Sequence, residues 1–362
     1  MDIPVKVPFY ARIALIFIGL FAFVFTMHIG QHIILPILYA TLMAILLNPL
    51  VNYLVRKKIK RVIAISIAVA LTLILVSGIL YVISTQASLF SETYPQLKEK
   101  VRLATAELVK WVSDNFRIKR LSINTWINET QSESIDDFEI GKQLSAVGQT
   151  LIIGMLLPVY IFLILYYKPL LLEFIRRLFQ AEHRVAVEKV LTGTKKIIQT
   201  YLTGLVFEMI IVAVLNSAGL LLLGIDYAII LGIIGAVLNL IPYIGGVVGT
   251  LLPMTIAFVT KDSMSYPILV FCVYIFIQFI DNNFIIPKIV ASRVQLNALT
   301  SIIAVLIGGA LWGVSGMFLS IPLTAVIKII FDHVEPLKPW GFLLGNIVPT
   351  TSRFAFGKRK KV

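Results

Sequence analysis

Long stretches free of charged side chains recur along the chain, separated by charged segments of very different length. They are residues 13–55, 62–91, 143–167, 209–225, 227–260, 263–280 and 294–327. A membrane-spanning helix needs about 20 consecutive apolar residues, so the first stretch can hold two helices, with a turn near residues 28–36. The stretches do not alternate apolar and polar residues as barrel strands do, which predicts an all-α polytopic membrane protein.

Composition supports a place in the lipid bilayer. Hydrophobic residues make up 58% of the 362 residues and charged residues only 14%, against roughly 25% charged residues in soluble domains. The single cysteine, Cys272, excludes an internal disulfide and a cysteine metal cluster. We attribute the net charge of +13 to membrane topology and expect no nucleic-acid partner.

Basic residues gather in four places that successive spans would bring to one side of the membrane. These are Lys6 with Arg12, residues 56–61, residues 168–198 and residues 357–361. The positive-inside rule makes this side cytoplasmic, so both termini are predicted to lie in the cytoplasm.

The same pattern divides the chain into six segments. We expect a three-span scaffold at 1–84, an extracytoplasmic helical segment at 85–147, a fourth span at 148–172, a cytoplasmic amphipathic segment at 173–199, a transport block at 200–335 and a basic cytoplasmic tail at 336–362. The residues around 171–180 are expected to form a short amphipathic helix at the membrane surface.

Two charge-free stretches of equal length, 227–260 and 294–327, are each interrupted near the middle. Proline removes a helical hydrogen bond and glycine relaxes the backbone. The interrupting residues are Pro242, Gly245, Gly246 and Gly249 in the first stretch, and Gly308, Gly309, Gly313 and Gly316 in the second, with Pro322 beyond. Two full spans with a turn would need roughly 40 residues, so each stretch is predicted to form a helical hairpin that enters the membrane and turns back.

Each hairpin follows one apolar segment, 200–224 before the first and 265–281 before the second, and the two pairs start from opposite sides. This order predicts an inverted helix–hairpin repeat beside about five to six full spans, and interrupted segments at matching positions favour a transporter. Two alternatives stay open. The hairpins could be full spans, which gives eight or more spans, and the Gly-x-x-x-Gly motifs could serve helix packing alone.

Polar residues after the second apolar segment are candidates for binding a substrate or an ion. Asp281, Asn282 and Asn283 offer a carboxylate and two amides, whose hard oxygens suit Na⁺ or a proton-coupled polar solute. The alternative is a helix C-terminus with an Asx turn.

Two further candidates lie earlier in the chain. Glu208 is an ionisable residue inside an apolar segment, where such groups are costly, although it could also reach the cytoplasmic interface. Asn239 lies deeper, with Asn216 and Ser217, and these residues could bind a ligand or bridge helices.

The sequence predicts no enzyme and no cofactor. It lacks the phosphate-binding motif G-x-x-x-x-G-K-[ST], and His28 and His32 lack the glutamate of an H-E-x-x-H zinc site. The segment GVSG (313–316) matches a membrane-protease motif, but Ser315 would need a histidine such as His333 beside it.

Three segments together resemble the autoinducer-2 exporter family of bacterial membrane proteins. They are NLIPYIGGVVGTLLP (239–253), IDNNFIIPKIV (280–290) and GGALWGVSGMFLSIPLTAVIKII (308–330), and the resemblance extends over roughly residues 10–335. The family's motif positions fall on Pro242, Gly245, Gly246, Asp281, Asn282, Pro287, Gly313, Gly316, Ile321 and Pro322. We take Pro287 and Gly309 as hinge candidates together with the interrupting residues named above.

The resemblance implies a secondary transporter of the bacterial inner membrane. Its expected cargo is a small polar solute, such as an autoinducer-2-like signal or a related metabolite, with Na⁺ or H⁺ as the coupling ion. Some family members are described as Na⁺(Li⁺)/H⁺ antiporters, which gives an alternative, and a passive channel is another. Members form homo-oligomers, pentamers among them, and the resemblance implies the same here.

Overall fold

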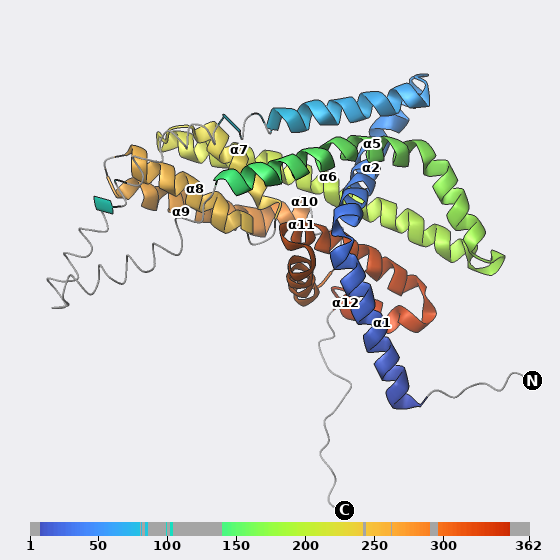
Figure 1. The fold of residues 1–362 in the computed structure, drawn as a ribbon. Coiled ribbons are helices and arrows are strands. Elements are labelled where there is room, and N and C mark those ends of the chain that lie inside the picture. The colour runs from blue at the N-terminus through green and yellow to red at the C-terminus, as the bar shows by residue number, and fades with distance from the viewer. Residues whose placement is uncertain are drawn as a thin grey trace, which may run out of the picture. The chain divides into compact units, whose positions relative to one another are not determined.

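A computed structural model describes residues 8–79, 81, 84–85, 99, 102–103, 140–241, 244–261, 263–289 and 296–347. Within these residues the chain is helical, and its only β-type pairing is an isolated bridge between Leu296 and Gly345 (Figure 1). Seven of the described helices are long and apolar enough to cross a membrane. The prediction of an all-α polytopic membrane protein is therefore confirmed, whereas most of the segment expected at 85–147 lies outside the described residues.

The helices follow one another with short connections. They are α1 (Phe9–Ile29), α2 (Gln31–Arg56), a helix at Arg61–Ile79, α5 (Ile140–Leu178), α6 (Arg184–Leu222), α7 (Ala228–Asn239), α8 (Ile244–Thr260), α9 (Ser265–Ile280), α10 (Ile286–Ile289), α11 (Ala298–His333) and α12 (Lys338–Leu344). Only Gly30 separates α1 from α2, so the turn expected at 28–36 is a single residue.

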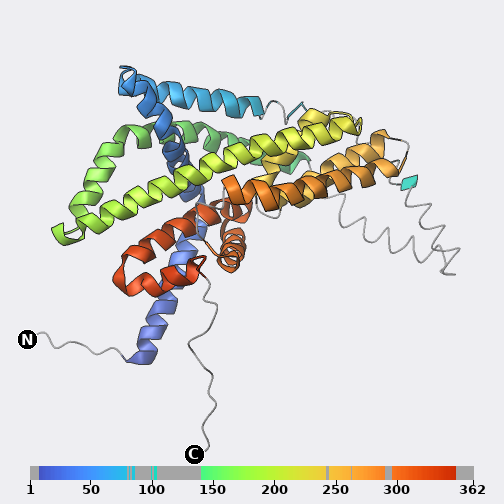
Figure 2. The same cartoon turned by 180° about the vertical axis from the view of Figure 1, so that it is seen from behind.

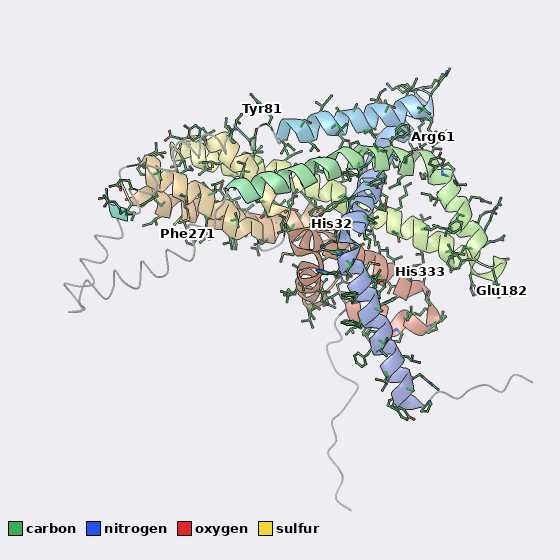
Figure 3. All side chains as sticks on the ribbon, in the orientation of Figure 1. His32, Arg61, Tyr81, Glu182, Phe271 and His333 are labelled. Atoms are coloured by element: carbon green, nitrogen blue, oxygen red, sulfur yellow. The ribbon has the colours of Figure 1, made fainter. Side chains whose placement is uncertain are left out.

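The cytoplasmic segment expected at 173–199 is made from the ends of two long helices. α5 continues to Leu178, and the short 3₁₀ turn Ala181–His183, where Figure 3 labels Glu182, leads into α6. The prediction of a short helix at 171–180 is therefore wrong, because residues 171–178 are the end of the 39-residue helix α5. Glu173 bridges Arg176 and Arg177 at 2.7 and 2.9 Å, one turn further on, which is compatible with an unbroken helix through this charged end.

The chain divides into two compact units. One comprises residues 1–35, 168–208 and 283–362, and the other comprises residues 36–167 and 209–282. Part of the second unit is a core where α2, the helix Arg61–Ile79 and α5 meet through small buried residues, among them Ala40, Ala44, Ala64 and Ala68. Its other core joins the end of α6 to α7, α8 and α9, which lie side by side in Figures 1 and 2.

The first hairpin consists of α7 and α8. α7 has 12 residues, which give a length of about 18 Å at 1.5 Å per residue. The hydrocarbon core of a bilayer is about 30 Å thick. α7 is thus too short to cross it, which favours a re-entrant hairpin over two full spans.

The second hairpin is α11, whose two limbs meet at Trp312 and Gly313, both with non-helical backbone angles. Gly313 has φ +60°, a conformation that glycine adopts without strain. A Cβ at Gly316 would overlap the carbonyl of Gly308, so the limbs touch backbone to backbone beside the turn.

Side-chain hydrogen bonds hold the turn of α11 to the end of α1. Trp312 Nε1 donates to the Met27 carbonyl at 3.0 Å. His28 Nδ1 donates to the Leu311 carbonyl at 2.9 Å. Both bonds lie inside the first unit, so α1 packs against the hairpin tip through a reciprocal pair of contacts.

Asn297 closes the opposite end of the α11 hairpin. Its Oδ1 accepts from the Thr300 N–H at 2.8 Å, and its Nδ2 donates to the carbonyls of Leu343 and Gly345 at 2.7 and 2.9 Å. A Cβ at Gly345 would stand 3.4 Å from Lys328 Cε. Gly345 therefore lies beside Asn297, where the first limb begins, and beside Lys328 in the second limb.

We expect Gly316→Ala to destabilise the protein, because the new methyl group would separate the two limbs of α11. The matched control is Gly78→Ala, where a Cβ would meet no atom within 4 Å and should be neutral or stabilise by about 0.5–1 kcal/mol. Thermal unfolding in detergent measures both variants. Equal melting temperatures for the two would contradict the close limb contact.

Labelling of introduced cysteines tests whether the hairpins are re-entrant. In a Cys272→Ser background, we expect Cys at position 240 to resist a membrane-impermeant maleimide added from the cytoplasmic side. Cys at position 314 should resist the same reagent added from outside. Strong labelling from those sides would show full spans. Lys57→Cys serves as the accessible control on the cytoplasmic side, because Lys57 is exposed in the turn that follows α2.

Candidate functional site

One face of α9 is buried, and the carboxylate of Asp281 lies in line with it at the C-terminal end of the helix. The buried residues recur at helical spacing and are Val270, Tyr274, Ile277 and Asp281, with Asp281 only 1% exposed. Phe271, labelled in Figure 3, lies on the exposed face of the same helix. Asp281 is therefore a charged member of a buried stripe that continues to Ile285.

The helix does not end at Asp281. Asp281–Ile285 form a π-helical turn, and the helix continues through α10 to Ile289. Pro287 has no N–H, so it removes one bond of the regular ladder beside this turn. The alternative of a helix C-terminus with an Asx turn is thus wrong, and π-helical turns within helices frequently occur at functional sites.

Asn239, at the end of α7, is the hydrogen-bond partner of Asp281. Its Nδ2 donates to Asp281 Oδ2 at 2.9 Å, joining residues 42 positions apart. Hydrogen bonds to charged groups contribute about 1.5–3 kcal/mol each. This bond fixes the end of the first hairpin limb to the end of α9.

Asp281 also lines a small cavity. Its volume is about 10 Å³, which is about the space that one water molecule needs. The lining residues are Val212, Asn216, Gly235, Asn239, Gly245, Gly246, Tyr274, Ile277, Gln278 and Asp281. The space has the size of one water molecule or one small cation.

Three buried atoms of the lining residues have no hydrogen-bond partner in the structure. They are Asn216 Oδ1, Tyr274 Oη and Asp281 Oδ1. Buried polar atoms are nearly always paired, so each exception calls for an explanation. Here the exceptions come from three residues that line one cavity.

Glycines let the helix backbones approach around the cavity. A Cβ at Gly235 would stand 3.1 Å from Asn216 Nδ2 and 3.3 Å from Tyr274 Oη. A Cβ at Gly249 would stand 3.3 Å from the Gly235 carbonyl, and one at Gly245 would overlap the backbone of Asn239. Any larger residue at position 235 would therefore occupy space beside the two polar groups.

The predicted binding candidates fall in different places. Asp281 and Asn239 line the cavity. Asn282 and Asn283 follow on the exposed side of the π-helical turn, so the three neighbouring side chains do not converge. Glu208 is buried in α6, makes an interaction of its own, and is not among the lining residues.

The predicted hinge residues are also distributed. Gly245 and Gly246 line the cavity and Gly249 packs α8 against α7. Pro287 is exposed in α10, and Pro242 lies outside the described residues. The remaining ones, Gly309, Gly313, Gly316 and Pro322, belong to α11.

Ser315 does not have His333 beside it, as the protease motif would require. Ser315 and His333 lie on the second limb of α11, about 27 Å apart at 1.5 Å per residue. His333 Nδ1 is hydrogen-bonded to the carbonyl of Ile329 at 2.8 Å. Ser315 and His333 therefore cannot form a catalytic dyad.

Sequence reasoning missed Tyr274 and Gln278 and treated Asn216 chiefly as a helix-bridging residue. The spacing of Tyr274, Gln278 and Asp281 places them on one face of α9 and could have indicated the first two. Asn216 could not be linked to them from the sequence, because the contact depends on how α6 packs.

The charge of the site rests on one residue. Asp281 is the only lining residue with a formal charge, and Tyr274 is the only other titratable one. The described part of the chain holds no group of three or more His, Cys, Asp or Glu residues placed to bind a metal ion. A buried carboxylate needs a compensating partner, and this cavity has room for a proton-bearing water or one small cation.

The fold and site together define a polytopic membrane protein with two glycine-rich helical hairpins, the first of which packs beside a buried acidic residue. Comparison with known families is consistent with this class. The family model described as AI-2E family transporter matches residues 13–335. The chain therefore belongs to the AI-2E family.

Curated relatives carry names from the same functional class. The chain is 28% identical over 259 residues to the putative permease PerM of Escherichia coli strain K12, covering 72% of this chain and 69% of that protein. It is 28% identical over 161 residues to the putative transport protein YueF of Bacillus subtilis strain 168, covering 44% and 43%. It is 33% identical over 133 residues to the putative transport protein YrrI of the same strain, covering 37% of each. The chain thus spans less than half the length of YueF and YrrI.

We expect Asn239→Ala to cost about 1–3 kcal/mol of stability, because it leaves a buried carboxylate oxygen without its donor. The exposed Asn282→Ala should change stability by no more than about 0.5 kcal/mol. Unfolding in mixed micelles with increasing SDS provides the measurement. In an Asp281→Leu background the cost of Asn239→Ala should nearly disappear, and an undiminished cost would contradict the pairing.

Proposed function

We propose that this protein is a secondary transporter that exports a small polar solute, of the autoinducer-2 type or a related metabolite, across the bacterial inner membrane. Membership in the AI-2E family and the names of its relatives support a transport role. The particular solute and the direction follow from the family resemblance alone.

The observation that carries the coupling part of the proposal is the cavity beside Asp281. Its volume of about 10 Å³ suits an ion or a water molecule. The buried carboxylate would take up the coupling ion, Na⁺ or H⁺, and the solute would bind elsewhere.

The position of Asp281 in the chain suits a coupling residue. It begins a π-helical turn, and the chain passes from one compact unit to the other directly after Asn282. Loading or emptying the site changes the charge next to this crossing. Such a charge change could bias movement of the glycine-rich hairpins, as alternating access requires.

An Na⁺(Li⁺)/H⁺ antiporter is a second candidate function. The observation that favours it is the same cavity, since a space of about 10 Å³ beside a buried carboxylate has the size of an ion site. A passive channel would have the same fold, but it could not move a solute against its gradient. Uphill flux driven by an ion gradient therefore distinguishes a coupled transporter from a passive channel.

The basic clusters support an orientation with both termini in the cytoplasm. The family resemblance supports a homo-oligomer, pentamers included. None of the α1 residues is buried within one chain, so this helix is available to lipid or to neighbouring copies.

Proteoliposomes provide the test of the proposed function. We expect wild-type protein to drive uphill flux of a solute or an ion along an imposed Na⁺ or H⁺ gradient, and Asp281→Asn to abolish the gradient dependence while the protein stays folded. Asn282→Ala is the matched control and should retain full flux. Wild-type flux with unchanged ion dependence in Asp281→Asn would refute the coupling role.

A further inference from the structure

The unpaired atoms of the cavity are all oxygens, and they come from two helices. Tyr274 belongs to α9, Asp281 is the first residue of the π-helical turn that continues this helix, and Asn216 belongs to α6. The side chains of Asn216, Tyr274 and Asp281 are 3%, 7% and 1% exposed. Bulk water therefore does not satisfy them.

The chemistry of these oxygens is that of a cation site. A carboxylate, an amide carbonyl and a phenol oxygen are hard ligands with lone pairs available. Asn239 Nδ2 already donates to Asp281 Oδ2, which leaves Oδ1 for another partner. The absence of a side chain at Gly235 keeps the space beside Asn216 and Tyr274 open.

We infer that Asn216 Oδ1 and Tyr274 Oη are ligands, together with Asp281 Oδ1, of one dehydrated Na⁺ ion in this cavity, and that these two neutral oxygens determine whether the site accepts Na⁺ as well as H⁺. This inference rests on the proposed function, because it specifies the ion that the coupling site takes up.

Charge and size both favour a monovalent ion. Asp281 is the only charged residue that lines the cavity, and Ca²⁺ sites usually combine several carboxylates with six to eight oxygens in all. Mg²⁺ usually keeps several of its waters, for which the volume of about 10 Å³ has no room. A single Na⁺ needs neither a second carboxylate nor a water shell of its own.

Na⁺ and H⁺ would make different demands on the same residues. A proton binds to one oxygen of Asp281, and the resulting O–H group needs no more than one acceptor. A dehydrated Na⁺ needs several oxygens around it to replace its water. Removal of the amide or phenol oxygen should therefore weaken Na⁺ binding and leave protonation of Asp281 possible.

The test measures ion binding by the purified full-length protein in detergent, independently of transport. Na⁺ is added at constant ionic strength against choline to weakly buffered protein, and proton release is followed with a pH indicator. Melting temperature as a function of Na⁺ concentration is the second readout. The variants are Tyr274→Phe, Asn216→Leu and Asp281→Asn, and the controls are Tyr227→Phe and Asn282→Leu, whose parent residues are exposed.

We expect wild-type protein and both controls to release protons and gain thermal stability with Na⁺. Tyr274→Phe and Asn216→Leu should each need about tenfold or more Na⁺ for the same response, since changes around a metal ion typically cost 10–100-fold in affinity. Both should keep the proton uptake of Asp281 on acidification, and Asp281→Asn should lose both responses.

The inference is overturned if wild-type protein does not respond to Na⁺, or if Tyr274→Phe and Asn216→Leu both respond within twofold of wild type. Failure of the proposed function gives a different result. Normal Na⁺ binding without gradient-driven flux would refute coupled transport and leave the site intact, whereas coupled flux that never depends on Na⁺ would refute only the site.

Discussion

The structure depends on how one carboxylate is accommodated inside an apolar bundle. Asp281 lies at the end of a stripe of α9 that is otherwise buried and apolar, apart from the Tyr274 hydroxyl. Burying a charge is costly unless hydrogen bonds and an opposite charge compensate it. Asn239 supplies one hydrogen bond, and the remaining oxygen lines a cavity where a cation or a proton can supply the rest.

Backbone contacts between glycines create this environment. Gly235, Gly245 and Gly249 allow α7 and α8 to pack closely beside α9, and Gly308 and Gly316 do the same for the two limbs of α11. In a membrane, helix association relies on such packing because lipid is as apolar as the side chains. The glycines that the sequence marks as helix interruptions are thus also the contacts that shape the site and the second hairpin.

Much of this arrangement could be predicted from the sequence. Charge-free stretches identified the helices, and the glycine and proline interruptions identified both hairpins, because these signals depend on local composition. The contribution of Tyr274 in α9 and the π-helical turn at Asp281 were not predicted. Three adjacent polar residues look like one site in a sequence, but helical geometry turns Asn282 and Asn283 away from Asp281. The unbroken helix through Glu173 was missed because its charged end resembles a surface segment.

The central claim is that the Asp281 cavity holds one ion per chain. Equilibrium binding of radioactive ²²Na⁺ to purified protein tests it most directly. The account predicts saturation at one Na⁺ per chain for wild type and no saturable binding for Asp281→Asn. Binding that persists in Asp281→Asn, or a wild-type protein that binds no Na⁺, would contradict the account.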